Sequence, residues 1–249
     1  MATEGGVRAD VAEARRLVAS SSRIVAFTGA GMSKESGLRT FRGDDGYWRE
    51  HRAESLATPA ALAADPVLVW EWFRERLAAR EGVRPHAGYA ALVALERRTG
   101  GMTVITQNVD GLHAEAGSGE VIELHGTLRT ASCLKERIRR FPVTSSLLAE
   151  LPPRCPCGSI LRPDVVLFGE PLPRVELEKA FEAAVRCDLM IVVGSSLVVH
   201  PAAGIPFAAL RSGAAVIEVN PEPTELSRSR GVVSIRGTAA SILPEVTGE

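Results

Sequence analysis

The sequence predicts an α/β fold: a doubly wound parallel sheet with a second, smaller domain that is helical, carries cysteines and is formed by two insertions. Short apolar runs rich in β-branched residues alternate with amphipathic or alanine-rich stretches, which is the pattern of a parallel sheet covered by helices. The expected strands are Ile24–Thr28, Met102–Thr106, Leu189–Gly194, Ala215–Asn220 and Val232–Ile235. The expected helices are Val7–Ser20, Pro85–Thr99, Arg174–Cys187 and Pro201–Ser212.

Two blocks interrupt this alternation. Thr58–Arg80 reads as helices, because Thr58-Pro59 is an N-cap followed by proline and Asp65-Pro66 repeats the signal. Gly126–Pro163 is poor in strand signals and holds three of the four cysteines. Two long surface loops are the weaker alternative, since structureless loops of this length are uncommon in compact domains. We therefore expect a smaller domain over the carboxyl edge of the sheet, where open α/β sheets bind ligands.

Composition sets the class of protein and its partners. The chain has 249 residues, of which 45% are hydrophobic, enough for one large domain or a large domain with a satellite. A net charge of −1 gives no electrostatic footprint for DNA or an anionic membrane. The N-terminus lacks an apolar signal segment, and the apolar runs are too short to span a bilayer. With only four cysteines, we expect a soluble, cytoplasmic protein without nucleic-acid or membrane partners.

A glycine-rich turn follows the first expected strand. Gly29-Ala-Gly-Met-Ser33 lets the backbone approach a phosphate, whose charge the following N–H groups stabilise. The dinucleotide fingerprint G-x-G-x-x-G is excluded because Lys34 stands where its third glycine belongs. A P-loop is excluded because Gly37-Leu38-Arg39 is not G-K-[ST]. The glycine turn, followed by Glu35-Ser-Gly37 and then Thr40-Phe41-Arg42, resembles the sirtuins, which are NAD-consuming protein deacylases.

A second motif, Gln107-Asn-Val-Asp-Gly-Leu-His113, comes directly after an expected strand. Taken alone, it would be read as a helix N-terminus capped by Asn108. Beside the glycine turn it is similar to the sirtuin Gln-Asn-x-Asp motif. The resemblance implies that Gln107, Asn108 and Asp110 contact the nicotinamide ribose and carboxamide, with Asn108 also catalytic. We interpret His113 as structural rather than catalytic.

Glu123-Leu-His125-Gly126 follows a short expected strand, Val121–Leu124. A histidine before glycine is usually a turn residue, but this one resembles the sirtuin Leu-His-Gly, whose histidine is the general base. A neutral imidazole can accept a proton near pH 7. The resemblance implies that the acyl-lysine carbonyl attacks C1′ of the nicotinamide ribose and that His125 then deprotonates a ribose hydroxyl. The products would be deacylated lysine, nicotinamide and O-acyl-ADP-ribose.

Later motifs extend the resemblance to nearly the whole chain. The apolar segment 162–170 is read as a strand, and in sirtuins its equivalent pairs with the substrate backbone, which implies substrate contacts at Val166, Phe168 and Gly169. Gly194-Ser-Ser-Leu, Asn220-Pro-Glu222 and Ala239 match the adenosine side of the cofactor site. The implied NAD contacts are Gly29, Ala30, Gly31, Phe41, Arg42, Trp48, Gln107, Asn108, Asp110, Gly194, Ser195, Ser196, Asn220, Pro221, Glu222 and Ala239.

The resemblance also implies the domain division. We expect one catalytic unit over residues 1–249. Its large Rossmann-like domain would comprise residues 1–42, 85–125 and 171–249, and its small domain residues 43–84 and 126–170.

The metal site departs from the family pattern. Sirtuins commonly hold zinc with two C-x-x-C pairs, whereas here Glu136 stands in the second position after Cys133 and the other pair is Cys155-Pro-Cys157. Zinc accepts a carboxylate oxygen, so a Cys3Glu site is possible. The alternative is a decayed site that binds little or no metal. We leave both open and expect ligands among Cys133, Cys155 and Cys157.

The helix after Pro66 bears on acyl preference. In Gly46-Tyr-Trp48, Ala57-Thr-Pro59 and this helix the chain is similar to class III sirtuins, which favour acidic acyl groups through a tyrosine and an arginine three residues apart. That spacing is occupied here by Phe73 and Arg76, which share a helix face. Arg76 can bind a carboxylate, but Phe73 offers no hydroxyl. We therefore expect deacetylation with reduced desuccinylation or demalonylation; the alternative is that Arg76 is a solvated helix residue.

Three other functions are weighed against a deacylase. An ADP-ribosyltransferase or NAD glycohydrolase would keep NAD cleavage but change the acceptor. A silent module that senses NAD or ADP-ribose is disfavoured because His125 and Asn108 are present. A dehydrogenase is set aside, since it needs the G-x-G-x-x-G spacing and an acidic residue closing a second strand, whereas Asp44 and Asp45 lie in a polar loop.

Overall fold

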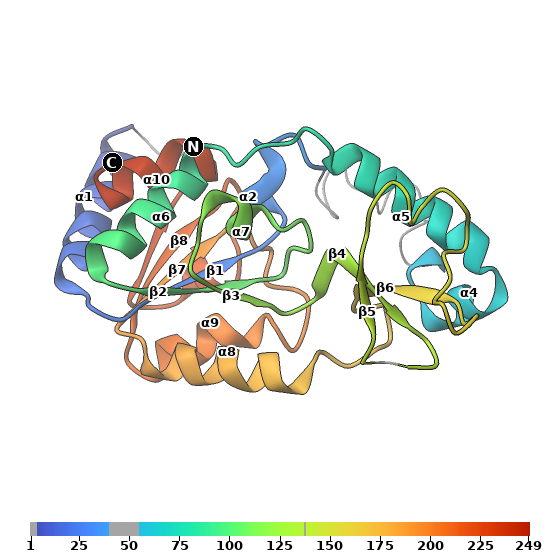
Figure 1. Ribbon diagram of the computed structural model, residues 1–249. Helices are drawn as coiled ribbons and strands as arrows, with labels where there is room; N and C mark the ends of the chain where they lie inside the picture. The colour runs from blue at the N-terminus through green and yellow to red at the C-terminus, as the bar shows by residue number, and fades with distance from the viewer. Residues whose placement is uncertain (1–3, 40–54, 137) are drawn as a thin grey trace.

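The computed structural model describes residues 4–39, 55–136 and 138–249. These residues form two lobes, which we call the large lobe and the small lobe (Figure 1). The large lobe contains α1 (Glu4–Ser20), β1 (Ile24–Thr28), α2 (Gly31–Lys34), α6 (Ala87–Thr99), β2 (Met102–Thr106), α7 (Leu112–Ala116), β3 (Glu120–Glu123), α8 (Arg174–Arg186), β7 (Leu189–Val193), α9 (Gly204–Arg211), β8 (Ala215–Val219), η2 (Leu226–Arg228), β9 (Val232–Ile235) and α10 (Ala239–Thr247). The small lobe contains α4 (Pro59–Ala64), α5 (Pro66–Arg80), β4 (Gly126–Cys133), β5 (Arg140–Pro142) and β6 (Leu161–Val165).

The large lobe is built on a six-stranded sheet in the order β3-β2-β1-β7-β8-β9. All neighbouring strands in it are parallel. The chain runs outward from β1 to β3 and then returns to place β7 on the other side of β1. The strand order therefore reverses between β1 and β7, which is the switch point where doubly wound sheets bind ligands. The predicted fold class is confirmed.

Alternate residues of β1 enter two different hydrophobic cores, because successive side chains of a strand point to opposite faces. Ile24 and Ala26 pack on the side covered by α1, α6 and α10. Val25 and Phe27 pack on the side covered by α8 and α9. Figure 1 shows the same two helical layers above and below the sheet. A strand buried on both faces explains why the run is continuously apolar.

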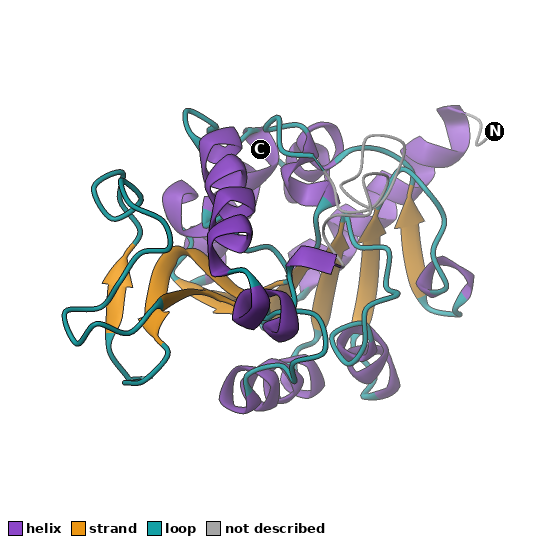
Figure 2. Ribbon diagram, turned by 90° about the vertical axis from the view of Figure 1, so that its right-hand side faces the viewer, coloured by secondary structure: helices purple, strands orange, loops and turns teal. Residues whose placement is uncertain are grey.

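The small lobe corrects one expectation. Residues 126–163, which we expected to be poor in strands, contribute a three-stranded antiparallel sheet in the order β5-β4-β6 (Figure 2). Its stabilisation is partly polar: Thr130 and Ser132 of β4 both donate hydrogen bonds to the carboxylate of Asp164 on β6. The strand expected over residues 162–170 ends at Val165.

The two expected helix starts in the small lobe are confirmed. Thr58 Oγ1 accepts a hydrogen bond from the N–H of Ala61 at 3.0 Å. Asp65 Oδ1 accepts one from the N–H of Leu68, also at 3.0 Å. Both side chains satisfy backbone donors that the first helical turn leaves open.

The other expected strands and helices occur with ends shifted by up to three residues. We did not predict α7 or α10 from the sequence. In the described part of the chain no helix is both long and apolar enough to cross a membrane. The expected domain boundaries remain a prediction.

Candidate active site

Two turns meet at the carboxyl edge of the sheet where the strand order reverses. The N–H of Gly29 donates to the carbonyl of Val193 at 3.0 Å, and that of Gly31 donates to Gly194 at 2.8 Å. A Cβ on Gly31 would lie 2.7 Å from the Cα of Gly194, and one on Gly194 would lie 2.3 Å from the nitrogen of Met32. Gly194 also has a φ of +59°, which disfavours residues with a side chain. Glycine is therefore required here for backbone contact.

Asn108 is held against the glycine turn. Its side-chain Nδ2 donates to the carbonyl of Gly29 and to Ser33 Oγ, both at 2.9 Å. Its backbone N–H donates to Thr106 Oγ1 at 3.0 Å. Asn108 is buried, so these bonds fix its amide in one orientation.

Asp110 faces the same serine. Ser33 Oγ donates to Asp110 Oδ2 at 2.7 Å, and the N–H of Leu112 donates to Oδ1 at 2.9 Å. Because the single hydroxyl hydrogen of Ser33 is used for the carboxylate, the hydroxyl of Tyr89, 2.8 Å away, must donate to Ser33 Oγ. Burial raises the pKa of Tyr89 above its usual value, which keeps it a neutral donor. Sequence reasoning missed Tyr89, since a tyrosine in an amphipathic helix carries no signal of its own.

His125 and Gln107 form a second pair. His125 Nδ1 lies 2.8 Å from the carbonyl oxygen of Gln107, so Nδ1 carries the proton and Nε2 keeps its lone pair. Gln107 Nε2 in turn donates to Ser195 Oγ at 2.8 Å, which joins the loops after β2 and β7. Burial lowers the pKa of His125, and the bond to the Gln107 carbonyl only partly opposes this. His125 is therefore neutral near pH 7, as a general base must be.

His113 lies deeper, in the core. Its Nε2 is 2.9 Å from Thr28 Oγ1, and Thr28 donates its own hydrogen to Thr106 Oγ1. Its ring packs edge-on against Tyr89 with centroids 4.8 Å apart. Burial lowers the pKa of His113 to about 3. This environment supports the interpretation of His113 as structural.

The residues expected on the adenosine side lie at the ends of β7 and β8 and at the start of α10. Asn220 Nδ2 donates to the carbonyl of Ser195 at 3.4 Å. Ser195 is buried, whereas the neighbouring Ser196 is exposed. Pro221 and Glu222 are exposed beside Asn220. Ala239 is buried at the first residue of α10, and its carbonyl closely approaches Gly88. The expected contacts Phe41, Arg42 and Trp48 lie outside the described residues.

The segment after β6 carries the expected substrate contacts. The N–H of Val166 donates to the carbonyl of His125 at 2.9 Å, and that of Phe168 donates to Ala57 at 2.7 Å. These bonds place the segment directly beside the candidate base. The side chain of Phe168 is partly exposed, and Gly169 has a φ of +88°. The segment is a loop rather than the strand we expected.

Phe73 and Arg76 meet at one aromatic ring. Phe73 is buried in the small lobe and packs edge-on against Trp72 with centroids 4.8 Å apart. The guanidinium of Arg76 lies over the same Trp72 ring, 4.0 Å from its centroid. Phe73 and Arg76 both lie in α5 and both contact Trp72, and their expected contacts with the acyl group stay a prediction.

The cysteines of the small lobe converge. The Sγ atoms of Cys133, Cys155 and Cys157, which we call the cysteine cluster, lie within 4.8 Å of one another. Those of Cys133 and Cys157 are 3.6 Å apart, close to the roughly 3.8 Å that tetrahedral zinc–sulfur bonds of about 2.3 Å require. Burial opposes ionisation of Cys133, but hydrogen bonds from the backbone of Glu136 and from Cys157 outweigh it and lower its pKa to about 7.

The fourth ligand is not supplied by Glu136. Its carboxylate lies 3.5 Å from Arg139, and only its backbone N–H, 3.2 Å from Cys133 Sγ, faces the cluster. The cluster fits three of the four ligands of a structural zinc. A bound zinc would cross-link β4 to the turn at 155–157; the proposed Cys3Glu set is not formed among the described residues.

Comparison with known proteins agrees with this architecture. Residues 29–201 match the Sir2 family model. An NAD-dependent protein deacylase of Pyrococcus furiosus is 47% identical over 242 residues, covering 95% of this chain and 96% of that protein. NAD-dependent protein deacylase 1 of Caldanaerobacter subterraneus is 51% identical over 209 residues, covering 84% of this chain and 86% of that protein.

Solved structures show the same likeness. The crystal structure of a Sir2 homolog–NAD complex superposes with a TM-score of 0.88 at 42% identity, covering 95% of this chain and 92% of that one. A Sir2 complex with a p53 peptide and NAD+ superposes with a TM-score of 0.85 at 32% identity, covering 95% and 96%. The predicted resemblance is confirmed: the chain belongs to the Sir2 family.

Proposed function

We propose that the protein is an NAD-dependent protein-lysine deacylase that yields deacylated lysine, nicotinamide and O-acyl-ADP-ribose. The observation that carries the proposal is the arrangement at the switch point of the sheet: Asn108 and Asp110 bind the glycine turn, and His125 binds the carbonyl of Gln107 in the same loop as Asn108. Relatives named NAD-dependent protein deacylase, and a Sir2 homologue solved with 2′-O-acetyl-ADP-ribose, support it.

Each residue has a role that its environment favours. The glycine turn packs directly on the loop after β7, and the pyrophosphate would lie beside these two turns at the carboxyl edge of the sheet. Asn108, fixed by Gly29 and Ser33, orients the ribose, and Asp110 receives the carboxamide. The acyl-lysine carbonyl oxygen bonds to C1′ as the bond to nicotinamide breaks. His125 Nε2 then takes a proton from a ribose hydroxyl, which attacks the acyl carbon; addition of water releases free lysine and leaves the acyl group on the sugar.

The substrate is an acyl-lysine within a protein. The loop at 166–169 lies beside His125 and offers the exposed ring of Phe168, which supports an extended peptide laid along it. Phe73 and Arg76 support deacetylation with weaker removal of acidic acyl groups. None of the four cysteines forms a disulfide, which suits a reducing compartment, and we place the protein in the cytoplasm.

Mass spectrometry of an acyl-peptide panel incubated with NAD tests the proposal. We expect nicotinamide release that depends on the acyl peptide, with stoichiometric free lysine and O-acyl-ADP-ribose. His125→Ala should still bind NAD but form no product. Nicotinamide release without peptide would indicate a glycohydrolase, and binding without any release would indicate a sensing module.

A further inference from the structure

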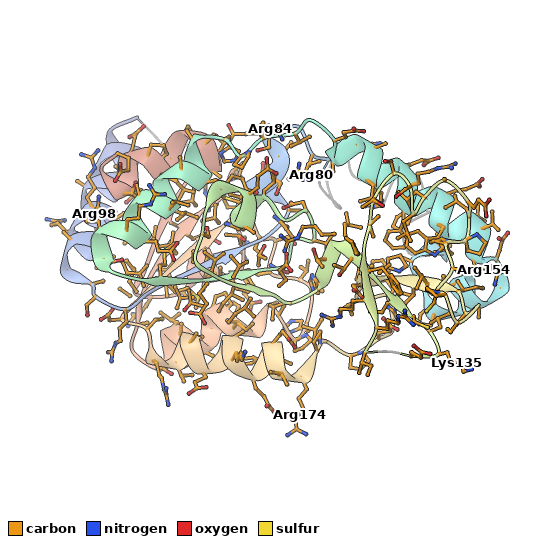
Figure 3. All side chains as sticks on the ribbon, in the orientation of Figure 1. Arg80, Arg84, Arg98, Lys135, Arg154 and Arg174 are labelled. Atoms are coloured by element: carbon orange, nitrogen blue, oxygen red, sulfur yellow. The ribbon has the colours of Figure 1, made fainter. Side chains whose placement is uncertain are left out.

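Arg80 ends the small-lobe helix α5, where the chain turns toward α6 of the large lobe. Figure 3 labels Arg80 and Arg84 in this crossing. The side chain of Arg80 is only 18% exposed, whereas that of Arg84 is 76% exposed. A guanidinium so largely removed from water must use its donors within the protein.

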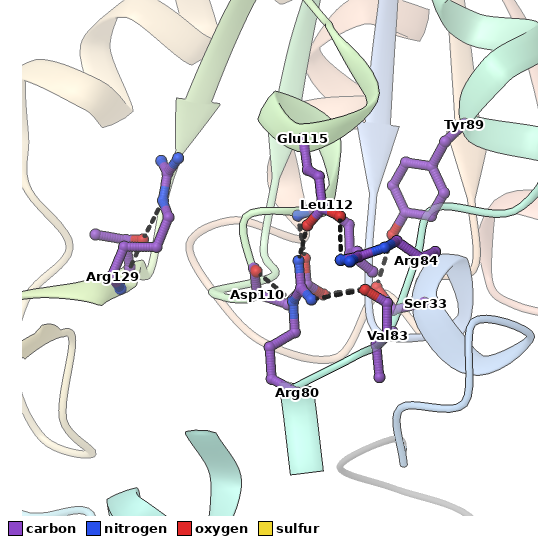
Figure 4. Close-up of polar contacts among 10 residues, drawn as sticks. Ser33, Arg80, Val83, Arg84, Tyr89, Asp110, Leu112, Glu115 and Arg129 are labelled. Atoms are coloured by element: carbon purple, nitrogen blue, oxygen red, sulfur yellow. Dashed lines mark hydrogen bonds and ion pairs between the residues drawn. The ribbon is translucent and has the colours of Figure 1, made fainter. Parts of the chain in front are cut away.

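Each guanidinium nitrogen of Arg80 contacts a different segment. Nε donates to the backbone carbonyl of Asp110 at 2.9 Å, and Nη1 donates to the carbonyl of Val83, in the crossing itself, also at 2.9 Å. Nη2 binds the carboxylate of Glu115 on α7. One side chain thus ties the small-lobe helix, the crossing and the Asp110 loop together (Figure 4).

Ser33 and Arg80 bind different groups of Asp110. The carboxylate of Asp110 accepts the hydrogen bond of Ser33, whereas its carbonyl accepts that of Arg80. The loop borders an open groove of about 370 Å³ whose lining includes Arg80, Asp110, Gly111 and Leu128. The hydrogen bond from Arg80 to the loop backbone, which borders this groove, contributes to the position of Asp110.

We propose that Arg80 is a positioning residue that couples the crossing between the lobes to the nicotinamide pocket through the backbone of Asp110. The inference rests on the proposed function, in which Asp110 receives the nicotinamide carboxamide. When Arg80 holds Asp110 and Val83 together, the carboxylate is in place for NAD. When that tie is lost, Asp110 and the small lobe move independently, and the pocket binds nicotinamide and NAD more weakly.

Arg84 provides a matched control. It is an arginine in the same crossing and binds the same carboxylate, with Nη1 3.1 Å from Glu115 Oε1. The described contacts of Arg84 include none to Asp110 or Val83. An ion pair with Glu115 is common to both arginines, although it is weaker for the exposed Arg84, whereas only Arg80 also binds the backbone of Asp110.

The test compares Arg80→Met, Arg80→Lys and Arg84→Met with the wild type in the full chain. Methionine keeps helix propensity and bulk but loses every donor. We expect Arg80→Met to raise both KM for NAD and the nicotinamide concentration for half-inhibition about tenfold, the value of one charge-assisted hydrogen bond. KM for the acyl peptide should change little, Arg80→Lys should be intermediate, and Arg84→Met should match the wild type.

A double-mutant cycle with Asp110→Asn separates positioning from general stability. If Arg80 acts through Asp110, the two substitutions together should cost less in KM for NAD than their separate effects multiplied. Multiplicative effects, or unchanged constants in folded Arg80 variants, would overturn the inference. If Arg80→Met does not fold, Arg80→Lys carries the same test. A wild type that releases no nicotinamide would instead refute the proposed function, so the two failures are distinguishable.

Discussion

Acidification should destabilise this protein through His113. The ring is buried, its Nε2–H donates to Thr28, and its Nδ1 has no hydrogen-bond partner among the described residues. Protonation would place a charge and an unsatisfied N–H in the core. Burial, with a smaller contribution from the charge of His86, lowers the pKa of His113 to about 3 from an ordinary value of 6.5.

The sign and size of the effect follow from that shift. Between pH 6.5 and pH 3, His113 binds a proton in the unfolded chain but not in the folded chain, so the free energy of unfolding falls as the pH is lowered. The contribution is complete above pH 6.5. At about 1.4 kcal/mol per pKa unit, roughly 5 kcal/mol is lost by pH 3 and about 2 kcal/mol by pH 5. Such a loss is a large part of the stability of an ordinary domain.

Urea unfolding at pH 7.5 and pH 5.0 measures it, with His113→Gln as the matched variant. Glutamine does not titrate and can still donate to Thr28. The free energy of unfolding should fall between the two pH values by about 2 kcal/mol more in the wild type than in His113→Gln. Other titrating groups cancel in this comparison. Equal pH dependence in both proteins would refute the burial of a neutral imidazole.

Three further results are expected. With kcat/KM measured against pH, activity should be flat above pH 6.5 and fall at lower pH with an apparent pKa below that value, because burial holds His125 neutral; a midpoint above 7 would contradict this. Phe73→Tyr should raise the ratio of desuccinylation to deacetylation about tenfold or more by adding a donor to a carboxylate, and an unchanged ratio would discard the acidic-acyl reading. Elemental analysis should find about one zinc per chain at the cysteine cluster, and a strong chelator should lower Tm. If the purified protein contains no metal and the chelator leaves its Tm unchanged, the cluster does not bind a structural zinc.

The sequence predicted the structure best where burial produces a simple pattern of apolar residues. The strands of the large sheet are buried on both faces, so their continuous apolar runs could be located to within a residue or two. The glycine turn was equally easy to predict, because a side chain at Gly31 or Gly194 would prevent contact between the two backbones. The roles of the residues after these turns rested on the sirtuin resemblance, because Asn108 taken alone reads as a helix N-cap and His125 as a turn residue.

The small-lobe sheet was not predictable in the same way. β4 reads Gly-Thr-Leu-Arg-Thr-Ala-Ser-Cys, with small and polar residues in place of an apolar alternation. What holds it is non-local: Asp164 lies more than 30 residues away from the Thr130 and Ser132 hydroxyls that bind its carboxylate. A buried acceptor shared between two strands has no local sequence period, so only the fold shows it.

Tyr89 and Arg80 illustrate the same limit at the site. Both lie on helices where tyrosine and arginine are ordinary, one facing the core and the other at a helix C-terminus. Their contacts form one hydrogen-bonded group only because the fold brings Ser33 and Asp110 between them. The available hydrogens then fix the direction of each hydrogen bond: Tyr89 donates to Ser33, Ser33 donates to the Asp110 carboxylate, and Arg80 donates to the backbone carbonyl of Asp110. Asp110, the expected nicotinamide contact, is thus held through its carboxylate by Ser33 and through its backbone carbonyl by Arg80.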